Sequence, residues 1–299
     1  MSSHGITPAD LRAVNLPRRK AVNRLMEGLA ALAALIAVGI LGIVVWSVAK
    51  RGAGALDLNL LTKGPSVAFS LGEVEQGLAN AFAGSLVLVG LATLMALPVG
   101  ILVAVYLTEF APNSIRYGVS LVLDVLNGIP AIVIGIFVYG LFVIGHGQSG
   151  WAGAFALACL MLPLVTRSTM EVLLLVPSAL REASLALGVP RWRTTLSIVL
   201  PQTVGGVVTG TVLAVARVAG ETAPLLFTSS LVGTQTSWNP SHALQSIPVA
   251  IFELSESPDP ADHARAWAAA LVLLLFILFA SLGGRWLATR SRRRLSTAR

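Results

Sequence analysis

Residues 176–201 read VPSALREASLALGVPRWRTTLSIVLP, and this stretch predicts a short helix with well-marked ends. Ser178 is an acceptable N-cap behind a proline, and apolar or small side chains recur after it at near-helical spacing. Gly188 suits the position just past the last helical turn, and Pro190 prevents continuation. About ten residues of helix span about 15 Å, which is too short to cross a bilayer. We therefore expect this helix to lie across the cytoplasmic mouth of a helical bundle, unless it is only a passive interfacial helix.

The composition around this stretch is that of a chain that crosses a membrane several times. Of 299 residues, 55% are hydrophobic and 12% are charged, and that charged share is about half the average for soluble domains. This excludes an ordinary soluble protein and a disordered one. Because a transmembrane helix needs about 20 apolar residues, we expect an all-α polytopic membrane protein with six transmembrane helices. They are 28–48, 82–107, 119–144, 151–171, 203–230 and 267–288.

These helices divide the chain into five parts. The first apolar run is too long for the core of a signal peptide, so we interpret it as an uncleaved anchor. The parts are a cytoplasmic tail (1–27), an N-terminal transmembrane helix (28–48), an extracytoplasmic loop (49–80), a five-helix transmembrane core (81–288) containing the loop 177–201, and a basic cytoplasmic tail (289–299).

The distribution of lysine and arginine predicts the orientation. Of these 21 residues, 16 lie on the side that holds both termini and the loop 177–201, four lie on the opposite side, and Arg217 falls within a predicted helix. Because cytoplasmic flanks are enriched in Lys and Arg, we expect both termini and this loop to be cytoplasmic. The net charge of +7 then reflects membrane orientation and not nucleic-acid binding. The outer loops, 49–80 and 231–266, are either solvated connectors or surfaces for docking or gating.

Two charged residues fall inside the predicted helix 203–230. Arg217 and Glu221 are four apart and would share one helix face, and a charge at mid-membrane costs about 2.5–3.5 kcal/mol on insertion scales. Pro224 leaves the carbonyl of Gly220 without its helical partner, which predicts a kink or break. Such features are typical of a bundle interior or a water-filled path. The alternative is an ion pair that only stabilises packing.

Polar residues also interrupt two other predicted helices. On the residues alone, Arg167 is better explained by anchoring at the membrane interface than by function. The stretch 123–137, LDVLNGIPAIVIGIF, places two polar residues and a proline in an apolar segment, which predicts a broken helix that faces the bundle interior. The residues that we expect at helix breaks or gates are Pro224, Gly220, Pro130 and Asn127.

Other chemistry is not indicated by the sequence. The single cysteine, Cys159, cannot form an internal disulfide, and no Cys/His group has the spacing of zinc ligands. The sequence contains no G-x-x-x-x-G-K-[ST] motif to hold nucleotide phosphates. Any ATP hydrolysis would therefore belong to another polypeptide.

The loop 177–201 resembles the signature loop of ABC importer permeases. Its spacing follows that family's pattern E-A-A-x3-G-x9-I-x-L-P, with Ser184 in place of the second alanine. The resemblance implies a type I ABC importer permease fold, in which the short helix is a cytoplasmic coupling helix that docks into a separate ATPase subunit. Coupling to the ATPase would then rest on Glu182, Ala183, Ser184 and Gly188.

Four further strings resemble the phosphate-importer permeases of the PstA type. They are YLTEFAP (106–112), LDVLNGIPAIVIGIF (123–137), ARVAGETAPLLFT (216–228) and AWAAALVLLL (266–275). In that family, arginines at the positions of Arg167 and Arg217 are implicated in moving phosphate, with Glu221 beside one of them. Guanidinium forks match phosphate oxygens, and Glu221 would partly neutralise Arg217 so that the anion can leave.

The same resemblance implies the partners and the location. The chain would be a multi-pass subunit of a prokaryotic cytoplasmic membrane that works by alternating access. It would act with a second permease (PstC type), with ATPase subunits (PstB type) that hold ATP and magnesium, and with an extracytoplasmic phosphate-binding protein (PstS type). The chain itself is expected to bind no cofactor or metal, to catalyse no reaction and to contact no nucleic acid.

Three other interpretations compete with this one, and the sequence shows no catalytic constellation that would favour the enzyme among them. A permease for another small oxyanion, sulfate or molybdate, would share the signature loop. A membrane-embedded enzyme would need a nucleophile and base or a metal site among the helices, and a channel would need no such loop.

Overall fold

A computed structural model describes residues 16–64, 77–230 and 236–297, and every regular element in those ranges is helical. The chain forms two compact units, residues 1–50 and 51–299. The first unit holds most of α1 (Leu16–Gly52), a 37-residue helix whose apolar side chains are exposed along its length. The predicted helix 28–48 lies within it. Most of the predicted tail 1–27 lies outside the described residues.

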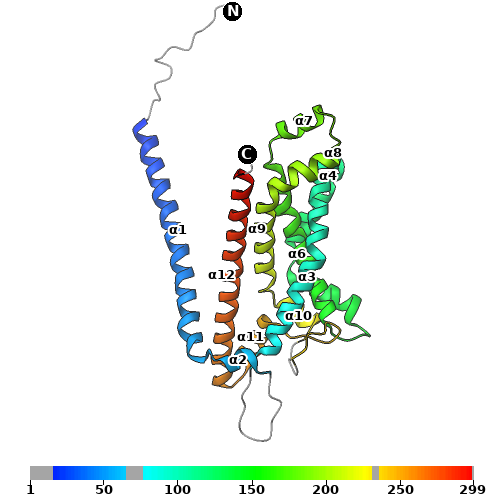
Figure 1. Ribbon diagram of the computed structural model, residues 1–299. Helices are drawn as coiled ribbons and strands as arrows, with labels where there is room; N and C mark the ends of the chain where they lie inside the picture. The colour runs from blue at the N-terminus through cyan, green and yellow to red at the C-terminus, as the bar shows by residue number, and fades with distance from the viewer. Residues whose placement is uncertain (1–15, 65–76, 231–235, 298–299) are drawn as a thin grey trace, which may run out of the picture. The chain divides into compact units, whose positions relative to one another are not determined.

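The second unit is a bundle of long helices joined by short ones. In Figure 1, α7 and α8 lie at the same end as the last turns of α12, whereas α2 and α11 lie at the opposite end. The elements are η1 (Ala53–Ala55), α2 (Leu58–Thr62), α3 (Ala79–Val105), η2 (Tyr106–Phe110), α4 (Asn113–Gly128), α5 (Ala131–Val138), η3 (Tyr139–Val143), α6 (Gly150–Leu174), α7 (Ser178–Ala186), α8 (Arg191–Thr194), η4 (Thr195–Val199), α9 (Leu200–Val218), α10 (Ala223–Thr228), α11 (Ile247–Glu256) and α12 (Pro260–Thr297).

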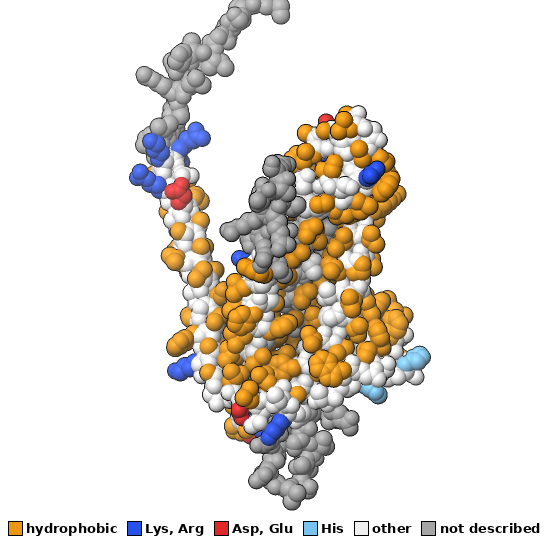
Figure 2. Space-filling view, in the orientation of Figure 1, with side chains coloured by type: hydrophobic (Ala, Val, Ile, Leu, Met, Phe, Trp, Pro, Cys, Tyr) orange, Lys and Arg blue, Asp and Glu red, His pale blue; other side chains and the backbone are white. Residues whose placement is uncertain are grey.

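Five helical stretches are long and apolar enough to cross a membrane, and a sixth span results if one bent pair is counted together. This confirms the predicted all-α polytopic fold. Figure 2 shows apolar side chains over much of the visible face of the bundle and few charged ones there, as suits a surface in contact with lipid. The five stretches are 18–55, 79–110, 150–174, 191–218 and 260–286.

The third predicted span, 119–144, is not one straight helix. α4 and α5 meet at an angle of 97° across a short break. Ile129 has extended backbone angles, and Pro130 caps the start of α5. A residue before proline is driven out of the helical region by steric clash, which accounts for the break.

The fifth predicted span, 203–230, was wrong at both ends. The helical stretch begins at Arg191 and ends at Val218. Beyond it the chain makes tight turns, in which the amide of Gly220 bonds to the carbonyl of Arg217 and that of Glu221 to the carbonyl of Val218. Pro224 lies in the first turn of α10, where its missing N–H costs no hydrogen bond. The proline therefore belongs to the start of a new helix.

Small residues allow the main helices to approach closely. A side chain added at Gly100 of α3 would meet Val165 of α6 at 2.9 Å, and buried Leu88, Leu157 and Met161 fill the core between these helices. Gly206 and Gly210 of α9 pack in the same way against Val172 and Ser168 of α6. α6 is consequently the central helix, held between α3 and α9.

The two broken segments pack against each other. Gly135 of α5 lies so close to Pro224 of α10 that a Cβ atom there would be 2.6 Å from the proline Cα. The half-helices after the two breaks are thus in direct contact.

Candidate functional site

Arg167 lies in α6 and is already bonded to a carboxylate. Its Nη2 atom is 2.5 Å from Oδ1 of Asp124 in α4, and it also donates to the backbone carbonyl of Ser120 at 2.8 Å. The Nε–H of the same guanidinium is buried and has no partner. This arrangement places a cation with a buried, unpartnered Nε–H inside a membrane-spanning helix.

Asp124 is one of the two polar residues in the stretch 123–137, and the sequence did not predict it as the partner of Arg167. Its side chain is 62% exposed in the isolated chain, and Asn127 is exposed as well. These exposures are those of the chain without its partners, so the expectation that the broken helix faces the bundle interior stays a prediction. Only one edge of α4, at Leu123, is buried, because α4 is amphipathic and contacts the bundle along that edge.

The sequence predicted that Arg217 and Glu221 share one face of a continuous helix. In the structure they do not, because α9 ends at Val218. Arg217 is in the last turn of α9 and is exposed, whereas Glu221 is half-buried in the turn after the helix. Among the ion pairs of the described residues, none joins these two side chains. Helical periodicity cannot place Glu221, since the helix has ended.

The two arginines lie at different depths. Gly210 of α9 touches Ser168, the residue next to Arg167, and the contact of Gly206 with Val172 shows that α9 and α6 run antiparallel. Arg217 follows Gly210 by seven residues, which is about 10 Å along a helix and nearly the same face. Moving from the α7 end of the bundle, an anion would meet the level of Arg167 before that of Arg217.

The expected gate residues occupy the two breaks. Asn127 is near the end of α4 and Pro130 follows it at the bend, while Gly220 and Pro224 flank the turn between α9 and α10. The contact between Gly135 and Pro224 links the two breaks.

The predicted short helix is α7, which begins one residue away from the expected cap. Pro177 occupies the N-cap position, and no side chain caps the helix, so Ser178 is the first helical residue. The exit matches the expectation for Gly188, whose φ of +78° lies in the left-handed region. The amide of Val189 bonds to the carbonyl of Ser184, and that of Gly188 to the carbonyl of Leu185. These two bonds form a Schellman motif.

The four residues proposed for coupling are not equally accessible. Glu182, Ala183 and Gly188 are exposed, but Ser184 is buried and shares a 2.8 Å hydrogen bond with the hydroxyl of Thr194 in α8. The hydroxyl of Ser184 therefore attaches α7 to α8 of the same chain. The sequence pattern, in which Ser184 counts only as a small residue, does not predict this bond.

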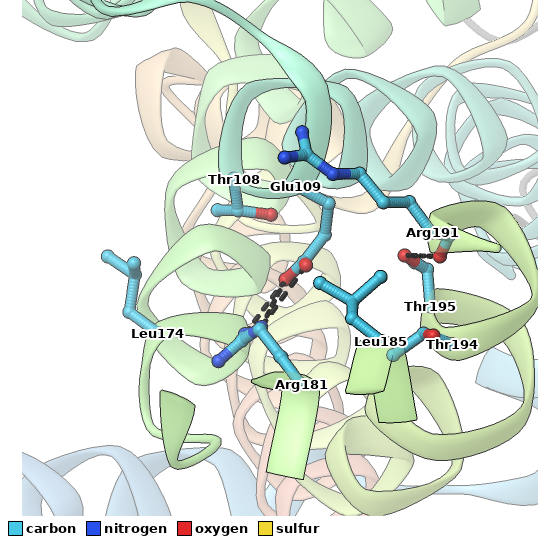
Figure 3. A pocket seen from close by; sticks show the side chains of 8 residues that line it. All are labelled: Thr108, Glu109, Leu174, Arg181, Leu185, Arg191, Thr194 and Thr195. Atoms are coloured by element: carbon cyan, nitrogen blue, oxygen red, sulfur yellow. Dashed lines mark hydrogen bonds and ion pairs between the residues drawn. The ribbon is translucent and has the colours of Figure 1, made fainter. Parts of the chain in front are cut away.

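The structure also reveals an ion pair that the sequence did not indicate. Arg181 of α7 binds Glu109 of η2, and these residues line a cavity of about 360 Å³ with Leu174, Leu185 and Thr195 among others. Figure 3 shows the guanidinium of Arg181 directed at the carboxylate of Glu109.

This bundle of membrane-spanning helices, with a short helix at one end, is the fold of the type I ABC importer permeases. Solved structures of that class share the fold. One shows inward-facing conformations of the MetNI methionine ABC transporter, with a TM-score of 0.57 and 17% identity over 72% of this chain and 94% of that one. Another is a bacterial alginate ABC transporter in complex with an alginate pentasaccharide-bound periplasmic protein, with a TM-score of 0.57 and 16% identity over 93% and 96%.

Within this class, the chain belongs to the family of binding-protein-dependent transport system inner membrane components, whose model matches residues 96–293, and within it to the PstA group. A phosphate transport system permease protein PstA of Haemophilus influenzae is 41% identical over 87% of this chain and 91% of the relative. PstA 1 of Mycobacterium tuberculosis is 42% identical over 73% of this chain and 72% of the relative. The chain is thus a multi-pass membrane protein of a transport system.

Proposed function

We propose that this chain is the permease subunit of an ATP-driven importer that carries inorganic phosphate into the cell by alternating access. The names of its relatives support phosphate as the substrate, and the shared fold supports an ABC importer as the type of transporter. The oxyanion alternatives, sulfate and molybdate, have no such support among the named relatives.

The ion pair between Arg167 and Asp124 is the observation that carries the proposal. The guanidinium of Arg167 lies in a membrane-spanning helix and already binds the Asp124 carboxylate at 2.5 Å. The same charged hydrogen bond can be made to a phosphate oxygen. Its unpartnered Nε–H offers a second donor in the fork geometry that suits phosphate. We infer that phosphate exchanges with Asp124 on Arg167, so that the arginine is not left without an anion in the resting state.

Arg217 would form the second station of the path. Its side chain is exposed and it lies about 10 Å from the level of Arg167 by helix geometry. Glu221, in the turn beyond, would lower the net positive charge there and prevent phosphate from being held too tightly, since transport requires release as well as binding. The contact of α5 with α10 would let the two helix breaks open and close together as gates.

The complete transporter would contain further subunits. We infer a second permease of the PstC type, ATPase subunits of the PstB type that bind ATP and magnesium, and a phosphate-binding protein of the PstS type outside the membrane. α7 and both termini would face the cytoplasm, and the exposed Glu182, Ala183 and Gly188 would contact the ATPase. This chain would need no cofactor of its own.

The test is uptake by the assembled complex in proteoliposomes, with its binding protein and ATP supplied on the appropriate sides. We expect ATP-dependent uptake of radiolabelled phosphate that excess unlabelled phosphate suppresses and excess sulfate or molybdate does not. Uptake of sulfate or molybdate in place of phosphate would contradict the proposed substrate.

A further inference from the structure

Arg181, next to the exposed Glu182 of α7, is bonded to two other helices at once. Its Nε donates to both carboxylate oxygens of Glu109 at 3.2 and 3.1 Å, and its Nη2 donates to Oε1 at 2.8 Å. The same guanidinium donates from Nη1 to the carbonyl of Val176 at 2.5 Å and from Nη2 to that of Leu173 at 2.9 Å. α7 is thus attached both to η2, which continues α3, and to the end of α6.

This ion pair is shielded from solvent. The side chain of Glu109 is 10% exposed and that of Arg181 is 22% exposed. Ion pairs at this burial are screened less by salt than surface pairs, and removing one partner leaves the other charge poorly compensated. The pair is therefore a stronger attachment than a surface ion pair.

Glu109 is itself held in place by the local backbone. It lies in the π-helical turn η2, and Arg116 donates to the carbonyls of Leu107 and Thr108 in that turn at 2.7 and 2.9 Å. π-helical turns often occur at functional sites. Because α3 packs closely against α6 at Gly100, a force on Glu109 is passed to both helices.

The attachment of α7 on its other side is weaker. Among the side-chain hydrogen bonds of the described residues, a neutral one joins Ser184 to Thr194 of α8, and Leu185, Arg191 and Thr195 line the cavity of about 360 Å³. Figure 3 shows Arg181 and Glu109 on one side of this space and Thr194 and Thr195 on the other. Apart from the chain connections on either side of it, α7 is thus held to η2 and α6 by charged hydrogen bonds and to α8 by a neutral one.

We propose that the Arg181–Glu109 pair is the joint through which α7 moves α3 and α6, and with α6 the side chain of Arg167. Both are positioning residues, since neither would touch phosphate. The proposal rests on the proposed function, because it presumes that a separate ATPase moves α7. Loss of the joint should leave ATP hydrolysis running without transport.

The test compares Glu109→Gln, Arg181→Gln and the exchange Glu109→Arg/Arg181→Glu in the full complex. Two quantities are measured per assembled complex: phosphate uptake, and the stimulation of ATP hydrolysis by substrate-loaded binding protein. Glu171→Gln is the matched control, since it removes an exposed carboxylate from α6. We expect each single variant to raise the ATP hydrolysed per phosphate by about fivefold or more, the lower range of coupling effects, and the exchange to restore at least part of the coupling.

Three results would overturn the joint. The first is normal coupling in both single variants. The second is a loss of ATP hydrolysis and phosphate uptake in the same proportion, so that the ATP hydrolysed per phosphate is unchanged. The third is that Glu171→Gln raises this ratio as much as the single variants do. Failure of the proposed function looks different, because the wild-type complex would then take up no phosphate. The stimulation of ATP hydrolysis would still report whether Glu109 and Arg181 couple α7 to the membrane helices.

Discussion

Arg167 of α6 and Asp124 of α4 form an ion pair 2.5 Å long within the membrane domain. The pair joins a central helix to one that contacts the bundle along a single edge. On the function proposed above, an anion that replaced Asp124 on Arg167 would remove this link between α4 and α6, so substrate binding would be connected with helix movement through the pair.

The first prediction concerns this pair. Because the carboxylate is 62% exposed in the isolated chain, Asp124→Asn should change stability by no more than about 1 kcal/mol. Phosphate uptake should nevertheless slow, since no carboxylate would displace the departing anion, while Arg167→Gln should abolish uptake. The measurement is uptake normalised to assembled complex. Normal uptake in Asp124→Asn would remove this residue from the cycle.

The second prediction concerns the exit of α7. Gly188 has φ of +78° with open space around its Cα, so a larger residue is opposed only by backbone strain of about 1–2 kcal/mol. Gly188→Val should uncouple ATP hydrolysis from uptake, whereas Gly188→Asn, which tolerates this conformation, should largely retain coupling. Equal behaviour of the two variants would show that the backbone conformation is not what matters.

The third prediction is the orientation. Ser114, in the first turn of α4 at the α7 end, and Ser241, before α11, are both exposed. In a Cys159→Ser background, an impermeant thiol reagent added to intact cells should label Ser241→Cys and not Ser114→Cys. The opposite pattern would invert the topology.

The fourth prediction is a pH dependence at the α11 end. Burial raises the pKa of the Glu253 carboxyl above its ordinary 4.5, a hydrogen bond from Gln245 opposes this, and Asp262 adds to it. The folded protein thus binds this proton more tightly than the unfolded chain, so this contribution to stability is full below pH 4.5 and is lost as the pH rises through the folded pKa. Glu253→Gln should reduce the fall in Tm from pH 4.5 to neutrality. Glu256→Gln, on the same helix but exposed, should not; an identical pH profile for both would refute the assignment.

The sequence predicted what depends on composition and local spacing. Apolar runs predicted the membrane helices, and Gly188 followed by Pro190 predicted the exit of α7, because backbone conformation there depends on a few adjacent residues. The partner of Arg167 could not be predicted, since Asp124 is 43 positions away and only the packing of α4 on α6 brings it near. The same holds for Glu109 and Arg181, which are 72 apart. The four-residue spacing of Arg217 and Glu221 predicted a shared helix face, and this prediction was wrong because the helix ends at Val218.

The most direct test of the proposed phosphate path is uptake by the double variant Arg217→Leu/Glu221→Leu, alongside Arg217→Lys. The structure places no ion pair between these two side chains among the described residues, so removing both charges should leave insertion and assembly intact. We expect no phosphate uptake per assembled complex in the double variant and impaired uptake in Arg217→Lys, because a point charge does not reproduce the guanidinium fork. Near-normal uptake by the assembled double variant would contradict the path.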